Sequence, residues 1–291
     1  MLQGTFNEVA GAQSSCRGVR SDRVPDRTVL GPRRDGHLGD GRSRRSRSRA
    51  PPWDASVSIG EGAQPHDLMH ATGFVIAALF WMGRWQDLVP VLDEHVAAFA
   101  LESDTKCELL HGGILAGASL LEHLGDHDAA RELVGMAAPF SASDPLWGGY
   151  ADGWRARFQI LAGDPLDGLQ RAEAVFASAH PWPRFHAATV IMEALISLDD
   201  RDALTEFLPT ARDLREGLAI LPPTCDRAEG HLAAADGDIA KALRLLGLAL
   251  EGFERLGVPF EAARTREALA AVAPPDAAAM LCGDHSIPTS D

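Results

Sequence analysis

Apolar and small residues return in register along most of this chain, and each cycle is closed by a similar polar turn. The intervals between successive turns are about 36 to 42 residues, which is the length of one helix hairpin in a repeat protein. The pattern therefore predicts a stack of antiparallel helix pairs. The five turns are Gly83-Arg84, Gly125-Asp126, Gly163-Asp164, Asp199-Asp200 and Gly237-Asp238.

Counting from the first residue of each turn gives four columns that we expect to pack between helices. Small residues in these columns let two helices approach closely, and larger apolar residues fill the groove between them. Seven positions before the turn stand Ile76, Ala118, Ala156, Met192 and Gly230, and five after it stand Leu88, Ala130, Gly168, Leu204 and Ala242. Nine after it stand Leu92, Val134, Ala172, Leu208 and Leu246, and twelve after it stand His95, Ala137, Val175, Ala211 and Ala249.

These columns resemble the small and large apolar positions of the tetratricopeptide repeat. The unit from Ala228 to Gly257 matches best, and with Val258–Arg264 it is similar to helical arrays of bacterial LuxR-type and maltose-regulator-type ATPases and of cyclase–ATPase fusions. The resemblance spans about His66 to Ala273. It implies an all-α, right-handed α-solenoid of about five to six antiparallel helix pairs. Two features depart from the family pattern: its aromatic position is not kept, and its helix-ending proline is absent.

The resemblance also implies where a ligand or partner would bind. In tetratricopeptide arrays, first-helix positions line the inner groove, and these positions fall thirteen and six residues before each turn here. Both rows are more polar than the packing columns, which is typical of a solvated binding groove; alternatively, they are surface residues on an unused concave face. The candidate groove residues are His70, Ser119, Tyr150, Trp154, Arg157, His186, Glu193, Arg227 and His231.

An aromatic stripe at helical spacing runs through Trp147, Tyr150, Trp154 and Phe158. One interpretation is an aromatic cage for a cation or a sugar. The other is burial against neighbouring helices, because bulky residues at this spacing form the core face of a helix. A cavity beside Tyr150, Trp154 and Arg157 would favour a small-molecule receptor over a protein adaptor.

Composition and charge divide the chain into three parts. Hydrophobic residues make up 46% of the sequence and the net charge is −14, yet the N-terminal part is rich in arginine. We expect residues 1–52 to be a disordered Arg/Ser/Gly/Pro-rich tail or a translation artefact, residues 53–273 the helical array, and residues 274–291 a short helix or disordered tail. The arginines could hold nucleic acid weakly.

Compartment and membrane association are also constrained by the sequence. The longest apolar run, Phe74–Met82, is about half of the ~18 residues that a membrane span needs. The four cysteines are isolated and form no C-x-x-C pair. We therefore expect no membrane association and a cytoplasmic location with reduced thiols.

Known catalytic motifs are missing from the sequence. Neither lysine follows a glycine as a phosphate-binding loop requires, and no G-x-S-x-G or H-E-x-x-H motif occurs. His66 and His70 share the spacing of zinc ligands, but two ligands do not define a site. We expect no cofactor, no metal and no enzymatic activity.

Together these features predict a non-enzymatic interaction or sensor module of a bacterial signalling or transcription-regulatory system. A partner segment would bind in the concave groove and change the curvature of the array, which would bias an output module. The alternatives are a small-molecule effector receptor detached from a LuxR-type or cyclase-associated ATPase and, less favoured, an enzyme of another class.

Overall fold

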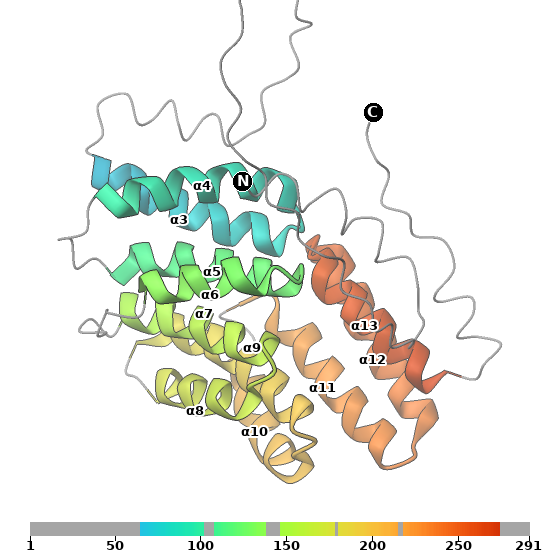
Figure 1. Cartoon of the computed structure of the whole chain (residues 1–291). Coiled ribbons are helices and arrows are strands. Elements are labelled where there is room, and N and C mark those ends of the chain that lie inside the picture. The colour runs from blue at the N-terminus through green and yellow to red at the C-terminus, as the bar shows by residue number, and fades with distance from the viewer. Residues whose placement is uncertain (1–64, 102–107, 138–145, 178–179, 215–217, 274–291) are drawn as a thin grey trace, which may run out of the picture.

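The computed structural model describes residues 65–101, 108–137, 146–177, 180–214 and 218–273, where all regular structure is helical. The predicted all-α class is thereby confirmed for these residues (Figure 1). The predicted tails, residues 1–52 and 274–291, lie outside them. The helices are α3 (Pro65–Trp81), α4 (Trp85–Leu101), α5 (Glu108–His123), α6 (His127–Ala137), α7 (Trp147–Leu161), α8 (Pro165–Phe176), α9 (Pro181–Ser197), α10 (Arg201–Asp213), α11 (Leu221–Ala235), α12 (Ile239–Leu256) and α13 (Pro259–Val272).

Each predicted turn contains a residue with left-handed backbone. The φ angle is 64° at Gly83, 83° at Gly125, 87° at Gly163 and 78° at Gly237, and the aspartate Asp199 reaches 52°. A left-handed residue lets two backbone N–H groups donate to the carbonyls of the helix that is ending. Both hydrogen bonds are present at all five positions, with donor–acceptor distances of 2.8 to 3.2 Å. The five predicted helix ends are confirmed.

The aspartate that follows the left-handed residue starts the next helix. The carboxylate of Asp238 accepts a hydrogen bond from the backbone N–H of Lys241 at 3.0 Å, and Asp126, Asp164 and Asp200 cap their helices in the same way. Such caps satisfy an N–H group that has no partner inside the helix. One Gly-Asp pair therefore ends one helix and begins the next, which explains why it recurs.

The first helices of the hairpins, α3, α5, α7, α9 and α11, contact one another in chain order, and each packs against its own second helix. The packing columns lie at these contacts. All residues seven before, five after and twelve after the turns are buried, and in the remaining column Val134 alone is half-buried. The predicted packing positions are confirmed with that one exception.

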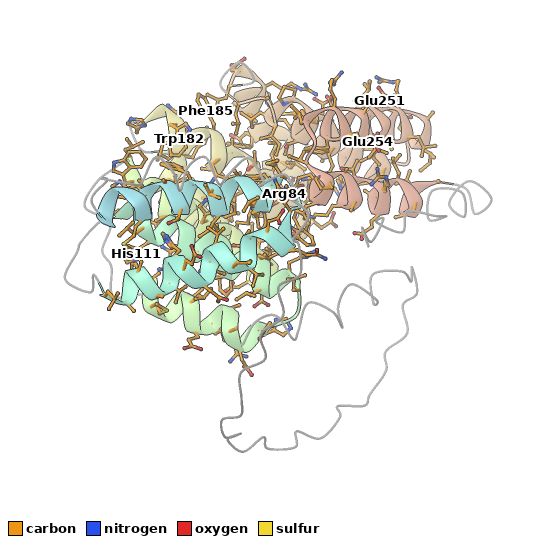
Figure 2. The ribbon with its side chains drawn as sticks, turned by 90° about the horizontal axis from the view of Figure 1, so that it is seen from above. Arg84, His111, Trp182, Phe185, Glu251 and Glu254 are labelled. Atoms are coloured by element: carbon orange, nitrogen blue, oxygen red, sulfur yellow. The ribbon has the colours of Figure 1, made fainter. Side chains whose placement is uncertain are left out.

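The last helix, α13, turns back toward the first hairpin. Figure 2, seen from above, shows α12 and α13 beside α3 and α4, with Arg84 of the first turn at the junction. The Phe260 ring lies 5.8 Å from that of Phe80 and 4.6 Å from that of His123. At Gly83 an added Cβ would stand 2.3 Å from Cγ of Pro259, so this turn accepts only glycine.

None of the described helices combines the length and the apolar character needed to cross a membrane.

Candidate functional site

Six of the nine predicted groove residues fall into two adjoining groups on the first helices. Tyr150, Trp154 and His186 line a cavity, whereas Arg157, Glu193 and Arg227 belong to a buried set of ion pairs with α13. Tyr150, His186, Arg157 and Glu193 come from the two rows that the sequence placed on one face, whereas Trp154 and Arg227 lie on first helices outside those rows. The face is not the open solvated groove that we expected, because neighbouring helices and α13 cover most of it.

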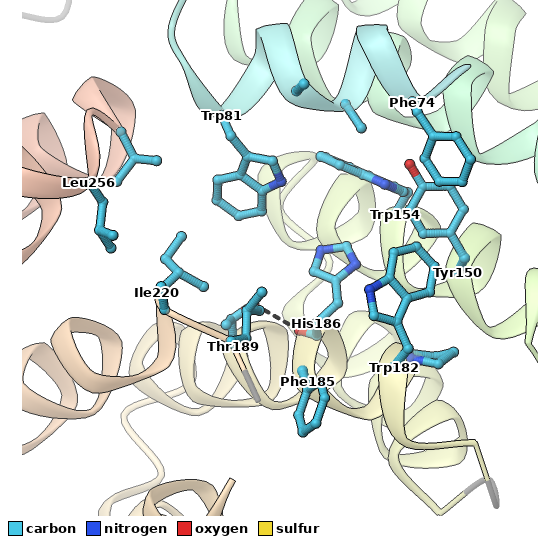
Figure 3. Close-up of a pocket in the computed structure, with 16 residues that line it drawn as sticks. Phe74, Trp81, Tyr150, Trp154, Trp182, Phe185, His186, Thr189, Ile220 and Leu256 are labelled. Atoms are coloured by element: carbon cyan, nitrogen blue, oxygen red, sulfur yellow. Dashed lines mark hydrogen bonds between the residues drawn. The ribbon is translucent and has the colours of Figure 1, made fainter. Parts of the chain in front are cut away.

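The cavity lies between α3, α7 and α9 and has a volume of about 360 Å³. We call it the aromatic cavity, because six large aromatic side chains form most of its wall (Figure 3). The linker before α11 and the end of α12 close its far side. Its lining residues are Phe74, Ala77, Ala78, Trp81, Tyr150, Trp154, Trp182, Pro183, Phe185, His186, Thr189, Leu218, Ala219, Ile220, Leu256 and Val258.

The aromatic rings of the cavity hold one another in place. The rings of Tyr150 and Trp182 stack at 5.1 Å with an interplanar angle of 24°. Trp154 meets His186 edge to face at 5.1 Å and lies 5.9 Å from Trp81. Trp182 is 40% exposed and therefore lies at the rim. The cavity thus has a rigid aromatic interior and an edge that solvent can reach.

Two glycines on the first helices leave space for these side chains. A Cβ at Gly112 would lie 2.2 Å from Cε1 of Tyr150, and a Cβ at Gly153 would lie 2.9 Å from Nδ1 of His186. Both contacts are too close for any side chain larger than hydrogen. The two glycines therefore position the polar groups of the cavity.

Three polar atoms in the cavity are buried without a hydrogen bond to any described residue: the Tyr150 hydroxyl oxygen, Trp154 Nε1 and His186 Nε2. Burial raises the pKa of the Tyr150 hydroxyl and the Trp154 indole beside it favours a lower value, but the two side chains do not meet hydrogen-bonding geometry. Buried polar groups are normally paired, so each unpaired one calls for an explanation. A bound molecule that supplies the partners would be such an explanation.

Burial keeps the titratable groups of the cavity neutral. It raises the pKa of Tyr150 to about 12. It also lowers the pKa of His186 to about 3, and the positive charge of Arg157 lowers it further. At neutral pH the lining therefore carries no formal charge, and no carboxylate or guanidinium is among its residues.

The second group, the ion cluster, consists of Arg157, Arg227, Arg264, Glu193 and Glu261. Arg157 and Glu261 are each 1% exposed. The Glu261 carboxylate accepts hydrogen bonds from Nη1 of Arg157 at 3.2 Å and from Nη1 of Arg227 at 2.6 Å. Glu193 pairs with Arg157 at 3.4 Å, with Arg227 at 3.6 Å and with Arg264. Each buried charge therefore has at least one opposite partner.

The electrostatics of Glu261 follow from this geometry. Burial alone would raise the pKa of its carboxyl, but Arg227, Arg157 and Arg264 together outweigh burial and lower it to about 2. The side chain is thus a carboxylate that α13 inserts among guanidiniums of α7 and α11. Sequence analysis missed Glu261 and Arg264, because neither lies in a first-helix row.

The two groups meet at Trp81. The guanidinium of Arg157 lies over the Trp81 ring at 4.4 Å from its centroid, and Trp81 also lines the cavity. This is a cation–π contact, in which the ring face attracts the positive charge. A change in the position of Trp81 therefore alters the wall of the cavity and the contact with Arg157 of the ion cluster.

The remaining predicted residues belong to neither group. Ser119 is buried and its hydroxyl donates to the Leu115 carbonyl at 2.9 Å, a bond within its own helix. His231 is half-buried, and burial, Arg227 and Arg264 lower its pKa to about 4. His70 is half-buried on α3, and no contact places it in the cavity.

Other sites of chemistry are not evident in the described part of the chain. There, no three side chains of His, Cys, Asp or Glu are grouped closely enough to hold a metal ion. Burial raises the pKa of the Cys225 thiol to about 11, so this thiol is not a reactive thiolate. Phe74 and Trp182, which complete the wall of the cavity, were not predicted as site residues.

Comparison with known proteins adds no relative from which a function could be carried over: no family model matches the chain, and neither a curated protein nor a solved structure matches it significantly.

Proposed function

We propose that this chain is a non-enzymatic effector-binding module, in which a small molecule occupies the aromatic cavity. The observation that carries the proposal is a cavity of about 360 Å³ with three buried polar atoms that lack hydrogen-bond partners in the described structure. Ligand sites are typically apolar cavities of about 300 to 1,000 Å³ in which a few polar groups converge. The cavity meets both conditions.

The helical arrangement supports a regulatory role for such a module. Five hairpins with equivalent turns and buried columns are consistent with a tetratricopeptide-like solenoid, the resemblance that links the chain to bacterial signalling ATPases. In this proposal the effector acts through Trp81, which lies between the cavity and the ion cluster that holds α13. Binding would change how firmly α13 is held, and an attached or partner protein would respond.

A fluorescent reporter tests this function directly. N-phenyl-1-naphthylamine is neutral and apolar, and we expect saturable binding to the purified chain. The substitution Ala78→Trp places a bulky ring into the cavity from an exposed position of α3, and we expect it to weaken binding at least about tenfold. Fluorescence titration measures the affinity, and circular dichroism confirms that the helices remain.

The matched control is Ala174→Trp, which adds the same ring at an exposed position of α8 outside the cavity. It should bind the reporter as the unmodified chain does. If Ala78→Trp also leaves the affinity unchanged, the reporter binds elsewhere and the aromatic cavity is not the site.

A protein partner is the second candidate, and α13 is the observation that favours it. This helix shows that the row containing Arg157 and Glu193 accepts a helical segment that carries a carboxylate. A partner helix with an equivalent acidic residue could displace α13 from the row. If a chain ending before Pro259 remains folded and binds a synthetic Pro259–Val272 peptide, this exchange is possible; absence of binding by the folded chain argues against it.

A further inference from the structure

We infer that the aromatic cavity selects a neutral, flat aromatic molecule that carries a hydrogen-bond acceptor, such as a ring carbonyl. The inference rests on the proposed function, because it names the chemical class that the same cavity would bind. Three features of the cavity support it: the shape of the wall, the charge around it and the type of its unpaired polar atoms.

The shape of the wall favours a flat molecule. Tyr150 and Trp182 present nearly parallel rings, Phe74 stands at 66° to Trp182, and Trp81 is inclined at 48° to Trp154 (Figure 3). Ring faces and ring edges attract another aromatic ring in stacked and edge-to-face arrangements. The volume of about 360 Å³ is near the lower end of small-molecule sites, which suits a compact ligand of two or three rings.

The charge around the cavity disfavours a cation, although an aromatic wall often binds one. No carboxylate lines the cavity, and one face of Trp81 is already occupied by the guanidinium of Arg157. The same guanidinium disfavours a proton on His186, so its positive potential extends into the cavity. A second cation would meet that potential without an opposite charge beside it.

A full negative charge is disfavoured for a different reason. The lining residues include no cationic side chain, because Arg157 lies behind the Trp81 ring and not in the wall. An anion would have to leave water without a direct ionic partner, which is costly in an apolar site. A neutral molecule avoids this cost.

The unpaired polar atoms call for an acceptor on the ligand. The Trp154 indole nitrogen can only donate a hydrogen bond, whereas the Tyr150 hydroxyl and the His186 ring nitrogen can each donate or accept. Tyr150 and Trp154 of α7 and His186 of α9 all line the cavity (Figure 3). A carbonyl oxygen accepts two hydrogen bonds, so it can satisfy the indole and the phenol together.

The test measures how well four compounds displace N-phenyl-1-naphthylamine from the chain. Each compound contains two fused six-membered rings. They are naphthalene, which has no acceptor; chromone, which has a neutral ring carbonyl; 2-naphthoate, an anion; and 2-naphthyltrimethylammonium, a cation. We expect chromone to bind at least about tenfold more tightly than naphthalene, and both charged compounds to bind more weakly than chromone.

Two variants assign the preference to named atoms. Trp154→Phe removes the indole donor and Tyr150→Phe removes the hydroxyl, and each should reduce the advantage of chromone over naphthalene severalfold. Tyr150→Phe keeps the ring, so the test holds even if Trp154→Phe does not fold. Trp85→Phe is the control, because Trp85 donates to the Phe80 carbonyl outside the cavity, and its ratio should match that of the unmodified chain.

The outcomes separate this inference from the proposed function. If the reporter binds in the cavity but naphthalene or either charged compound binds as tightly as chromone, the acceptor class is wrong and the effector site remains. An unchanged chromone preference in both cavity variants would also overturn the inference. If Ala78→Trp fails to weaken the reporter, the proposed function itself is wrong.

Discussion

The aromatic cavity and the ion cluster are neighbours to which α7 and α9 both contribute, but their polar groups are in different situations. In the ion cluster every buried charge has an opposite partner, and Glu261 of α13 completes the set. In the cavity, three buried polar atoms of uncharged groups have no hydrogen-bond partner among the described residues. Burial is common to both regions, so it does not distinguish a structural element from a candidate site. The difference is that the charges of the cluster have ionic partners, although Nε of Arg157 makes no hydrogen bond, whereas the three uncharged groups of the cavity have neither kind of partner.

Removing the carboxylate of Glu261 should give the largest effect. Glu261→Gln keeps the size of the side chain but leaves Arg157 and Arg227 to share Glu193 in a buried environment. Breaking a buried ion pair in this way typically costs about 3 to 5 kcal/mol. Urea unfolding should show a loss of that size. Glu251→Gln, at an exposed position of α12, is the control and should change stability by less than about 0.5 kcal/mol (Figure 2). A loss below about 1 kcal/mol for Glu261→Gln would mean that the cluster does not hold α13.

Acidification should affect the two regions in different pH ranges. The pKa of His186 is lowered from 6.5 to about 3, so the unfolded chain binds a proton more readily between these values and stability falls as pH decreases through that range. The pKa of Glu261 is lowered from 4.5 to about 2, so its contribution is complete above about pH 4.5 and is lost toward pH 2.

Variants isolate each contribution from those of the other titratable groups. His186→Gln should flatten the stability profile between pH 6.5 and 4.5 by at most about 1.4 kcal/mol per pH unit, because one proton is involved. Glu261→Gln should flatten it below pH 4.5. Denaturant titrations at stepped pH give both profiles. Identical profiles for His186→Gln and the unmodified chain would show that His186 is not held neutral by burial.

Removing the Tyr150 hydroxyl should have the smallest effect, and one of opposite sign. The hydroxyl is buried without a hydrogen bond, so Tyr150→Phe should stabilise the ligand-free chain by about 1 kcal/mol. Thermal unfolding would show a rise of a few degrees in the midpoint. A clear destabilisation would indicate that the hydroxyl is satisfied in solution, and the contrast with the ion cluster would then be lost.

The turns and packing columns could be predicted because they depend on nearby residues. Gly125 and Asp126, for example, end one helix and cap the next within a few positions. Tyr150, Arg157 and Glu193 were also placed on one face, because the resemblance to tetratricopeptide arrays assigns their positions to the inner side of the first helices. Their solvent exposure was not predictable in this way, because Arg157 is covered by Glu261, which lies 104 residues further along the chain.

The aromatic cavity was only partly predictable for a related reason. The stripe that contains Tyr150 and Trp154 had two interpretations, and a cavity beside these residues was expected to favour a small-molecule receptor over a protein adaptor. Trp182 was not among the predicted site residues. Whether an aromatic residue fills a core or borders a cavity depends on the sizes of the side chains opposite, as Gly112 and Gly153 illustrate. Residue spacing does not contain that information.

The contact between Pro259 and Gly83 has a consequence for how this molecule unfolds. In an open repeat array each unit touches only its neighbours, so the terminal units can fray one at a time. Here the last helix packs on the first turn, and Phe260 packs on Phe80. Each end therefore buries apolar surface of the other, and unfolding of the last helix would expose Phe80 of the first hairpin to solvent. We expect the array to melt in one cooperative transition, with slow formation of this last, most distant contact setting the pace of folding.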